Sequence, residues 1–274
     1  MSLTNDTDSV NDWSSINLAF GKQAAHFDAD DLANPVLQSW RKQIYDHVEG
    51  FLKPGDRLLE FNAGTGIDAF HFARQGYSVL ATDLSTGMVQ EIARKLSKNP
   101  TPHLTWKQLS FENLDQLGPV RFDYVFSNFG GLNCIRDLSL VTQHLSKILN
   151  AGAYLTWVVM PPFCPWELLW LFKGKWREAF RRFQSGGAEA RLEGECFQTY
   201  YHSVSDVRKA LGDSFKLVRS EGLGIFSAPP AASGFYRNYP GLYRTLRKVD
   251  GYLEDRFPFN RWGDHIIVTF QKAK

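Results

Sequence analysis

The stretch that decides the fold is LLEFNAGTGIDA, residues 58–69. An apolar run reaches Glu60, a turn of small residues follows, and a helix-forming sequence begins after Gly66. Gly64 and Gly66 let the backbone approach a ligand closely and adopt dihedral angles that other residues avoid. The helix beyond the turn starts with unpaired backbone N–H groups. We therefore expect a strand, a ligand-binding turn and a helix, in that order.

A second acidic residue, Asp83, ends the next apolar run after this turn. A carboxylate at that place can accept both hydroxyl hydrogens of a ribose. The glycine turn and the acidic strand end together predict a site for an adenosine-type ligand. The alternative is a tight turn followed by an aspartate that only caps a helix.

The sequence around the turn alternates between strand-like and helix-like patterns, which is typical of a parallel sheet with helices on both faces. Two late strands separated by a long excursion suit an antiparallel finish. We expect an α/β fold with a Rossmann-like, doubly wound, mostly parallel seven-stranded sheet, an antiparallel last strand and a helical lid insertion. The expected strands are 57–61, 77–82, 104–109, 122–127, 154–160, 215–219 and 265–270.

Changes of pattern along the chain predict its division into three parts. Residues 1–160 form an N-terminal cap and a cofactor-binding core. Residues 161–197 form a helical lid insertion, which is aromatic and basic. Residues 198–274 return to the same core and carry a helical insertion at 231–261.

Composition and charge exclude several classes of protein. The 274 residues include 31 Lys and Arg against 29 Asp and Glu, so nothing suggests a nucleic-acid partner. The three cysteines are widely spaced and odd in number, which indicates a reducing compartment. The polar, acidic first residues lack the pattern of a secretory signal, and we expect a cytoplasmic protein. The seven histidines do not cluster at ligand spacing, so no metal is expected.

The spacing Gly64-x-Gly66-x-x-Ala69 also satisfies the dinucleotide fingerprint, and an NAD-dependent oxidoreductase is therefore one alternative. Glu60 argues against NAD, because a carboxylate at the mouth of the strand would repel a pyrophosphate. It would suit S-adenosylmethionine, which carries a sulfonium and an ammonium group and no phosphate. A second alternative is a non-catalytic protein that binds the cofactor on the same fold.

Four segments in order resemble the motifs of class I S-adenosylmethionine-dependent methyltransferases of the small-molecule type. They are the glycine turn, Asp83-Leu84-Ser85 with Met88, residues 122–130 and residues 149–155. The resemblance covers residues 20–160 well and 198–274 loosely. It implies a methyltransferase that transfers a methyl group in line from S-adenosylmethionine to a small, hydrophobic or aromatic molecule.

The resemblance also implies which residues hold the cofactor. Arg41 would reach the cofactor carboxylate as a bidentate donor, or else lie on a solvated helix face. The other residues are Glu60, Ala63, Gly64 and Gly66 with Asn62 at the methionine moiety, Asp83 at the ribose, Leu84 and Met88 on adenine, Ser110 and Phe111 at the adenine edge, and Asn128 and Phe129 beneath the sulfonium.

Two positions depart from the family pattern. Asn62 replaces the first glycine of the motif, so its amide must fit or replace a contact. Leu109 stands where many relatives have an aspartate that reads the adenine amino group. Adenine recognition would then depend on backbone groups around Ser110.

The acceptor is expected beneath two segments. Residues 20–28 resemble the lead-in of small-molecule methyltransferases and can fold over the cofactor; the alternative is a surface lead-in. Residues 166–183 would cover the acceptor, contact a membrane surface weakly, or simply pack on the core. The candidate pocket residues are Phe27, Asn133, Trp166, Trp170 and Tyr200.

His202 and Tyr201 are the candidate general bases, because a histidine or tyrosine there could take a proton from a hydroxyl or an acidic carbon. The alternative is an aromatic strand with a surface histidine. If His202 is the base, His202→Ala should lower turnover more than cofactor affinity. The sequence leaves open the acceptor, the methylated atom and the oligomeric state.

Overall fold

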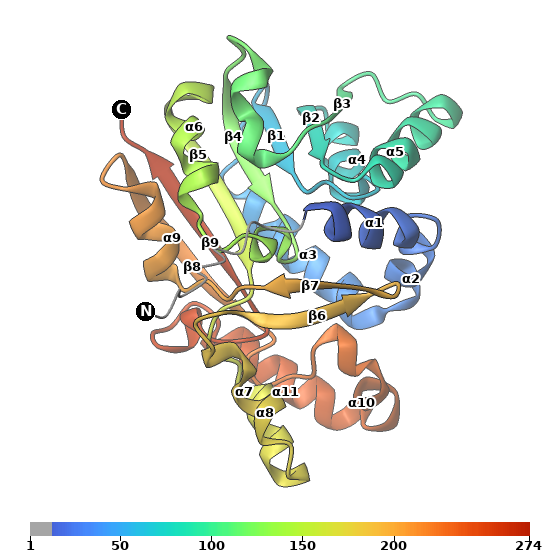
Figure 1. Ribbon diagram of the computed structural model, residues 1–274. Helices are drawn as coiled ribbons and strands as arrows, with labels where there is room; N and C mark the ends of the chain where they lie inside the picture. The colour runs from blue at the N-terminus through green and yellow to red at the C-terminus, as the bar shows by residue number, and fades with distance from the viewer. Residues whose placement is uncertain (1–12) are drawn as a thin grey trace, which may run out of the picture.

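The computed structural model describes residues 13–274 and contains the expected seven-stranded sheet (Figure 1). Its strand order is β3-β2-β1-β4-β5-β9-β8. Strands β1 to β5 pair in parallel, whereas β9 is antiparallel to both β5 and β8. This confirms the predicted Rossmann-like fold class. The strands are β1 (Arg57–Phe61), β2 (Ser78–Asp83), β3 (Leu104–Gln108), β4 (Phe122–Ser127), β5 (Leu149–Val159), β8 (Phe215–Leu223) and β9 (His265–Lys272).

Helices cover both faces of the sheet because successive strand residues point to opposite sides. Leu59 and Phe61 face one apolar cluster, and Leu58 faces the other. The first cluster includes residues of α6 (Ser139–Ile148), α9 (Val204–Leu211) and the 3₁₀ helix η1 (Phe111–Leu117). The second includes residues of α3 (Pro35–Glu49), α4 (Ile67–Arg74), α5 (Thr86–Lys98) and α11 (Pro240–Leu253).

The predicted lid insertion contains two different structures. Short helices come first: α7 (Pro165–Leu168), η3 (Leu169–Lys173), α8 (Trp176–Phe180) and η4 (Arg181–Phe183). They extend from the lower end of the molecule in Figure 1. An antiparallel hairpin of β6 (Ala188–Leu192) and β7 (Glu195–Thr199) follows. Glu193 and Gly194 between the strands both have positive φ, as a two-residue type I′ turn requires. The prediction of a helical insertion over residues 161–197 was therefore wrong for residues 188–197.

Helices α1 (Trp13–Gln23) and α2 (Phe27–Ala33) form a cap above the carboxyl end of the sheet. Gly21 and Gly87 touch backbone to backbone, since a Cβ on Gly87 would lie 2.7 Å from the Gly21 carbonyl oxygen. The hairpin supports α1 from the other side, where the Lys22 Nζ atom lies 2.7 Å from Glu195 Oε1. The hairpin therefore braces α1 over the carboxyl edge.

The second helical insertion contains α10 (Ser233–Asn238), α11 and the short η6 (Phe259–Arg261). Another short helix, η2 (Gly131–Cys134), follows β4 and shapes the carboxyl edge. Within residues 13–274, no helix is both long and apolar enough to cross a bilayer.

Candidate cofactor and acceptor site

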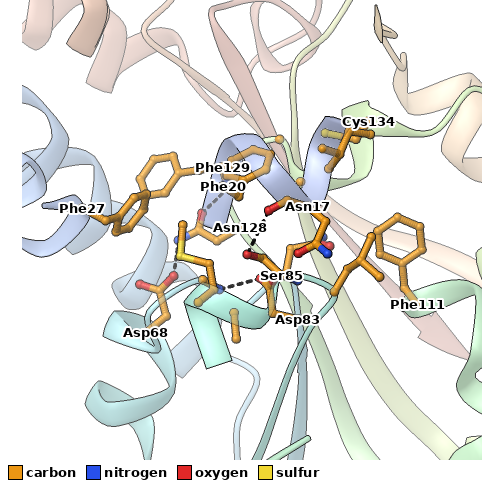
Figure 2. A pocket seen from close by; sticks show the side chains of 18 of the residues that line it. Asn17, Phe20, Phe27, Asp68, Asp83, Ser85, Phe111, Asn128, Phe129 and Cys134 are labelled. Atoms are coloured by element: carbon orange, nitrogen blue, oxygen red, sulfur yellow. Dashed lines mark hydrogen bonds between the residues drawn. The ribbon is translucent and has the colours of Figure 1, made fainter. Parts of the chain in front are cut away.

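A cavity of about 900 Å³, including the part that opens to solvent, lies at the carboxyl ends of β1, β2 and β4. This is the point where the strand order reverses, which is where open α/β sheets bind ligands. Helix α1 closes the cavity from above (Figure 2). The lining residues from α1 and α2 are Trp13, Ile16, Asn17, Phe20 and Phe27.

The glycine turn forms the floor of this cavity. Asn62 and Gly64 both line it and both have positive φ, 50° and 56°. Asparagine tolerates this left-handed region better than other side chains, so it can replace the first motif glycine. Its Nδ2 donates to Ser127 Oγ at 2.9 Å. The departure at Asn62 is thus compatible with the motif's backbone geometry.

Gly66 does not line the cavity, contrary to the prediction. It is the residue before α4, with φ of 84°. A Cβ at this position would lie 3.0 Å from Ile92 Cγ1. Glycine is therefore required here by the backbone conformation and by close packing of α4 against α5.

Asp83 lies at the cavity wall and is oriented by the glycine turn. Its Oδ2 accepts the Gly64 N–H at 2.9 Å, and its Oδ1 accepts the Ser85 N–H at 2.7 Å. Burial raises the pKa of Asp83 to about 6, although these backbone hydrogen bonds oppose the rise. A carboxylate has lone pairs for further donors, so two ribose hydroxyls can still be accepted.

The apolar part of the cavity next to Asp83 is suited to a flat base. Leu84, Met88 and Phe111 line it, and Trp13 contacts Phe111 edge to face at 5.5 Å. Ser110 was expected here but does not line the cavity. Its hydroxyl oxygen instead accepts the Glu112 N–H at 3.3 Å and caps η1.

A network of charged groups that the sequence did not predict surrounds Asp68. Asp68 accepts hydrogen bonds from Arg41, from Tyr45 Oη at 2.5 Å and from Asn128 Nδ2 at 2.8 Å. Arg41 also pairs with Asp31, with Nη2 2.7 Å from Oδ2. Asp68, Arg41 and Asn128 line the cavity. Figure 2 shows Asp68 beside Asn128. An acidic residue in the first turn of a helix is common, so the sequence offered only its closeness to the glycine turn as a signal.

Arg41 is buried, which rules out the solvated helix face considered above. Burial alone would lower the pKa of Arg41, but the charge of Asp68 and the hydrogen bond to Asp31 raise it above its ordinary value. The guanidinium thus stays charged. It also lies over the Phe129 ring, 4.8 Å from the ring centroid.

Glu60 lies behind the cavity wall, outside the lining in which the prediction had placed it. The residue is 1% exposed and does not line the cavity. Strand alternation turns its side chain to the same side as Leu58, away from Leu59 and Phe61. Burial, together with the charge of Asp68, raises the pKa of Glu60 well above its ordinary value. The negative charge at the wall therefore comes from Asp68 and Asp83.

The end of the cavity near Asp68 is aromatic. Phe20, Phe27 and Phe129 lie there in Figure 2. Phe129 has a φ of 45°, a strained value for a bulky residue that is often found at functional sites. Cys134 also lines the cavity, but burial raises its pKa to about 12 and keeps it a thiol.

The remaining predicted site residues lie elsewhere. Asn133 is fully buried and joins chain segments: its Nδ2 donates to the Met160 carbonyl at 3.0 Å, and its Oδ1 accepts the Met160 N–H at 2.9 Å. Trp166 packs on Phe235, and Trp170 lies beneath Lys173 and Lys175. Of the described residues, none beyond Cys134 lines the cavity, so the helices of 165–183 are not its lid.

Tyr200, Tyr201 and His202 line a separate groove, together with Arg136 and Asp206. The His202 Nε2 atom lies 2.9 Å from the Ile135 carbonyl oxygen and is engaged there. Burial lowers the pKa of His202, which keeps the ring neutral. The structure thus contradicts the expected place of these candidate bases at the site.

Comparison with known proteins supports this interpretation of the cavity. A model of the methyltransferase domain family matches residues 58–152. A demethylmenaquinone methyltransferase from Beutenbergia cavernae is 32% identical over 152 residues, which cover 52% of this chain and 58% of that protein. The chain spans about half the length of the curated relatives it matches.

Two solved structures share the fold. The CcbJ methyltransferase from Streptomyces caelestis has a TM-score of 0.60 and 16% identity, covering 93% of this chain and 98% of that one. A 1,6-didemethyltoxoflavin-N1-methyltransferase from Burkholderia thailandensis was solved with 1,6-didemethyltoxoflavin and S-adenosylhomocysteine bound. It has a TM-score of 0.56 and 14% identity, covering 95% and 88%. Residues 58–152 are thus similar to the methyltransferase domain family, and the fold of the chain is shared with these two solved methyltransferases.

Proposed function

We propose that this protein is an S-adenosylmethionine-dependent methyltransferase that acts on a small, hydrophobic or aromatic molecule. The observation that carries the proposal is the placement of two carboxylates in one cavity. Asp83, fixed by the Gly64 and Ser85 N–H groups, is suited to a ribose. Asp68, at the other end, is suited to an ammonium group (Figure 2).

The residues present fit the cofactor part by part. Leu84, Met88 and Phe111 offer an apolar surface for adenine next to Asp83. Arg41 keeps N–H groups beyond those used by Asp31 and Asp68, and these can meet a carboxylate. A nicotinamide dinucleotide fits less well, because Asp68 and Asp83 would repel its pyrophosphate.

When bound, S-adenosylmethionine supplies a methyl group on a positively charged sulfur. The role of the chain is to position the reactants. Asp83 and Asp68 hold two ends of the cofactor, and helix α1 covers the cavity. Phe20, Phe27 and Phe129 form an apolar wall at which an acceptor can be aligned. Alignment of this kind supplies most of the acceleration of an in-line transfer.

The aromatic wall favours a flat acceptor ring. The relatives include demethylmenaquinone methyltransferases and a ubiquinone biosynthesis O-methyltransferase, whose names refer to menaquinone and ubiquinone. We therefore infer that the acceptor here is an aromatic molecule of quinol or phenol type. Phe27 would contact it from α2, as the family resemblance suggested.

The function can be tested by transfer of a radiolabelled methyl group. The acceptor panel would contain 1,4-naphthalenediol as a quinol headgroup, together with simple phenols and amines. Labelled product is expected with the wild type and should fall at least tenfold in Asp83→Asn, since a hydrogen bond to a charged group contributes about 1.5–3 kcal/mol. Binding of S-adenosylhomocysteine without transfer to any member of the panel would favour the non-catalytic alternative.

We also propose that residues 165–183 contact an anionic membrane surface. These residues expose large apolar side chains: Phe172 is 89% exposed, Trp176 63% and Phe183 54%. Lys173 and Lys175 lie beside them on Trp170. Aromatic side chains flanked by cations are typical of segments that lie at a bilayer interface. Such contact would bring a lipophilic acceptor near the protein.

Co-sedimentation with vesicles tests this contact. The wild type should bind phosphatidylserine-containing vesicles at low salt and release them at high salt, because the cations contribute through screened attraction. Phe172→Ser with Trp176→Ser should abolish binding, and Trp106→Ser, on the exposed face of β3, is the matched control. Equal binding by all variants, or loss of a dimer in the double variant, would contradict the proposal.

A further inference from the structure

A histidine outside the predicted site lies at the same edge of the sheet as the cavity. His265 is the first residue of β9, and its neighbour Ile266 pairs with Val159 at the carboxyl end of β5. Because β9 runs antiparallel, its beginning meets the carboxyl ends of the parallel strands. More than a hundred residues separate His265 from the glycine turn, so no local sequence pattern predicts that the two lie at the same edge of the sheet.

The imidazole of His265 touches two elements of the cavity wall. Its ring is edge-to-face with Phe129, with centroids 6.0 Å apart at 90°. A Cβ built on Gly130 would lie 3.3 Å from His265 Nε2. Phe129 and Gly130 both line the cavity. His265 itself does not line the cavity; its imidazole lies behind Gly130 and packs on the backbone of the loop that forms the wall.

The other ring nitrogen is fixed by a carboxylate. His265 Nδ1 lies 2.9 Å from Asp264 Oδ2, and Arg182 Nη2 donates to Asp264 Oδ1 at 2.8 Å. Burial alone would raise the pKa of Asp264, but the His265 hydrogen bond and the Arg182 charge outweigh it and hold the pKa below its usual range. Asp264 is thus an anion that accepts a hydrogen bond from the Nδ1–H group of His265. This holds the proton on Nδ1 and leaves the Nε2 lone pair free to accept another proton.

Charged groups from several elements surround this pair. Arg182 comes from η4 and is shared with Glu167 of α7, whose Oε1 accepts the Arg182 Nε–H at 2.8 Å. Cys164 lies close to Asp264, and burial raises its pKa to about 12, so it remains a thiol. Arg41 of α3 lies over the Phe129 ring, whose edge-to-face contact joins it to the imidazole. Within residues 13–274, the side chain of His265 forms its hydrogen bond through Nδ1, with Asp264.

We propose that the Asp264–His265 pair is the proton acceptor of the reaction and that the acceptor molecule carries an ionisable aromatic hydroxyl group. This proposal rests on the proposed methyltransferase function. The hydroxyl proton passes to His265 Nε2 through one water, because His265 does not itself line the cavity. The electron pair left on the acceptor oxygen forms the bond to the methyl carbon, and the pair of the carbon–sulfur bond passes to sulfur. Asp264 acts as a positioning residue that stabilises the protonated imidazole.

The first test measures proton transfer without turnover. The probe is 4-nitrophenol, added to the complex with S-adenosylhomocysteine at a pH below the probe's own pKa. We expect the absorbance of the nitrophenolate ion to appear with the wild type and with His202→Gln, whose histidine lies in the separate groove. His265→Gln should lose this signal while binding S-adenosylhomocysteine within twofold of the wild type.

The second test measures turnover with 1,4-naphthalenediol across pH. His265→Gln should lower kcat at least a hundredfold, within the usual contribution of general base catalysis, and should remove the rise of rate with pH. The proposal would be overturned if His265→Gln formed nitrophenolate as the wild type does or kept the wild-type pH profile. It would also be overturned if the wild-type complex formed no nitrophenolate. Failure of the wild type to bind S-adenosylhomocysteine would instead refute the proposed function, and this inference with it.

Discussion

Replacing Asp68 with asparagine should weaken the binding of S-adenosylhomocysteine while sparing ligands that lack its amino-acid end. Asp68 is buried at the cavity wall and accepts bonds from Arg41, Tyr45 and Asn128. Two unit charges about 4 Å apart interact by about 4 kcal/mol at an effective dielectric constant of 20. Arg41 offsets part of this attraction for an ammonium group. We expect a loss of about 2 kcal/mol, a roughly thirtyfold higher Kd.

Isothermal titration calorimetry with two ligands separates this role from general damage. 5′-Methylthioadenosine has the nucleoside but no ammonium or carboxylate group, so Asp68→Asn should change its Kd by less than threefold. Asp83→Asn is the matched control, because the ribose is common to both ligands and both should bind more weakly. Equal weakening of both ligands by Asp68→Asn, or no weakening of either, would refute the assignment.

Three further predictions concern the walls of the cavity. Affinity for S-adenosylhomocysteine should fall as the pH is lowered through about 6, because burial raises the Asp83 pKa to that value and the protonated acid accepts fewer hydrogen bonds; calorimetry should find this dependence absent in Asp83→Asn. Gly131→Ala should lower stability by about 1–3 kcal/mol in thermal unfolding, since its Cβ would clash with Asn62 Nδ2, and Asn62→Gly should restore much of it; an unchanged Tm would contradict this packing. Lys22→Glu should speed ligand release up to about fivefold in stopped-flow measurements, because a partly exposed ion pair contributes at most about 1 kcal/mol, and adding Glu195→Lys should reverse the effect; identical rates in all three proteins would show that the pair does not hold α1.

The fold and half of the cofactor site could be predicted because their signals are local. The glycine turn and Asp83 each end a strand, and strand ends meet at one edge of a parallel sheet. Asn62 lay within that signal too, and its positive φ explains why it replaces a glycine. Glu60 belonged to the same motif, but side-chain alternation along β1 places it behind the wall.

The other half of the site depends on contacts between distant parts of the chain. Asp68 acquires its role from Arg41 and Asn128, which no local pattern connects to it. His265 begins the last strand and meets the cavity only because β9 runs antiparallel to β5. His202 was favoured by its closeness in sequence to the insertion, yet its side chain lines the separate groove. Whether each of these residues belongs to the site depends on which way its strand runs and its side chain points. A local stretch of sequence does not determine either.

The most direct test of the proposed cofactor site is a calorimetric comparison of two ligands with the unmodified protein. We expect S-adenosylhomocysteine to bind, since it offers a ribose to Asp83 and an ammonium group to Asp68 and carries no phosphate. We expect no measurable binding of NAD under the same conditions. Tight binding of NAD with no binding of S-adenosylhomocysteine would refute the assignment of both carboxylates.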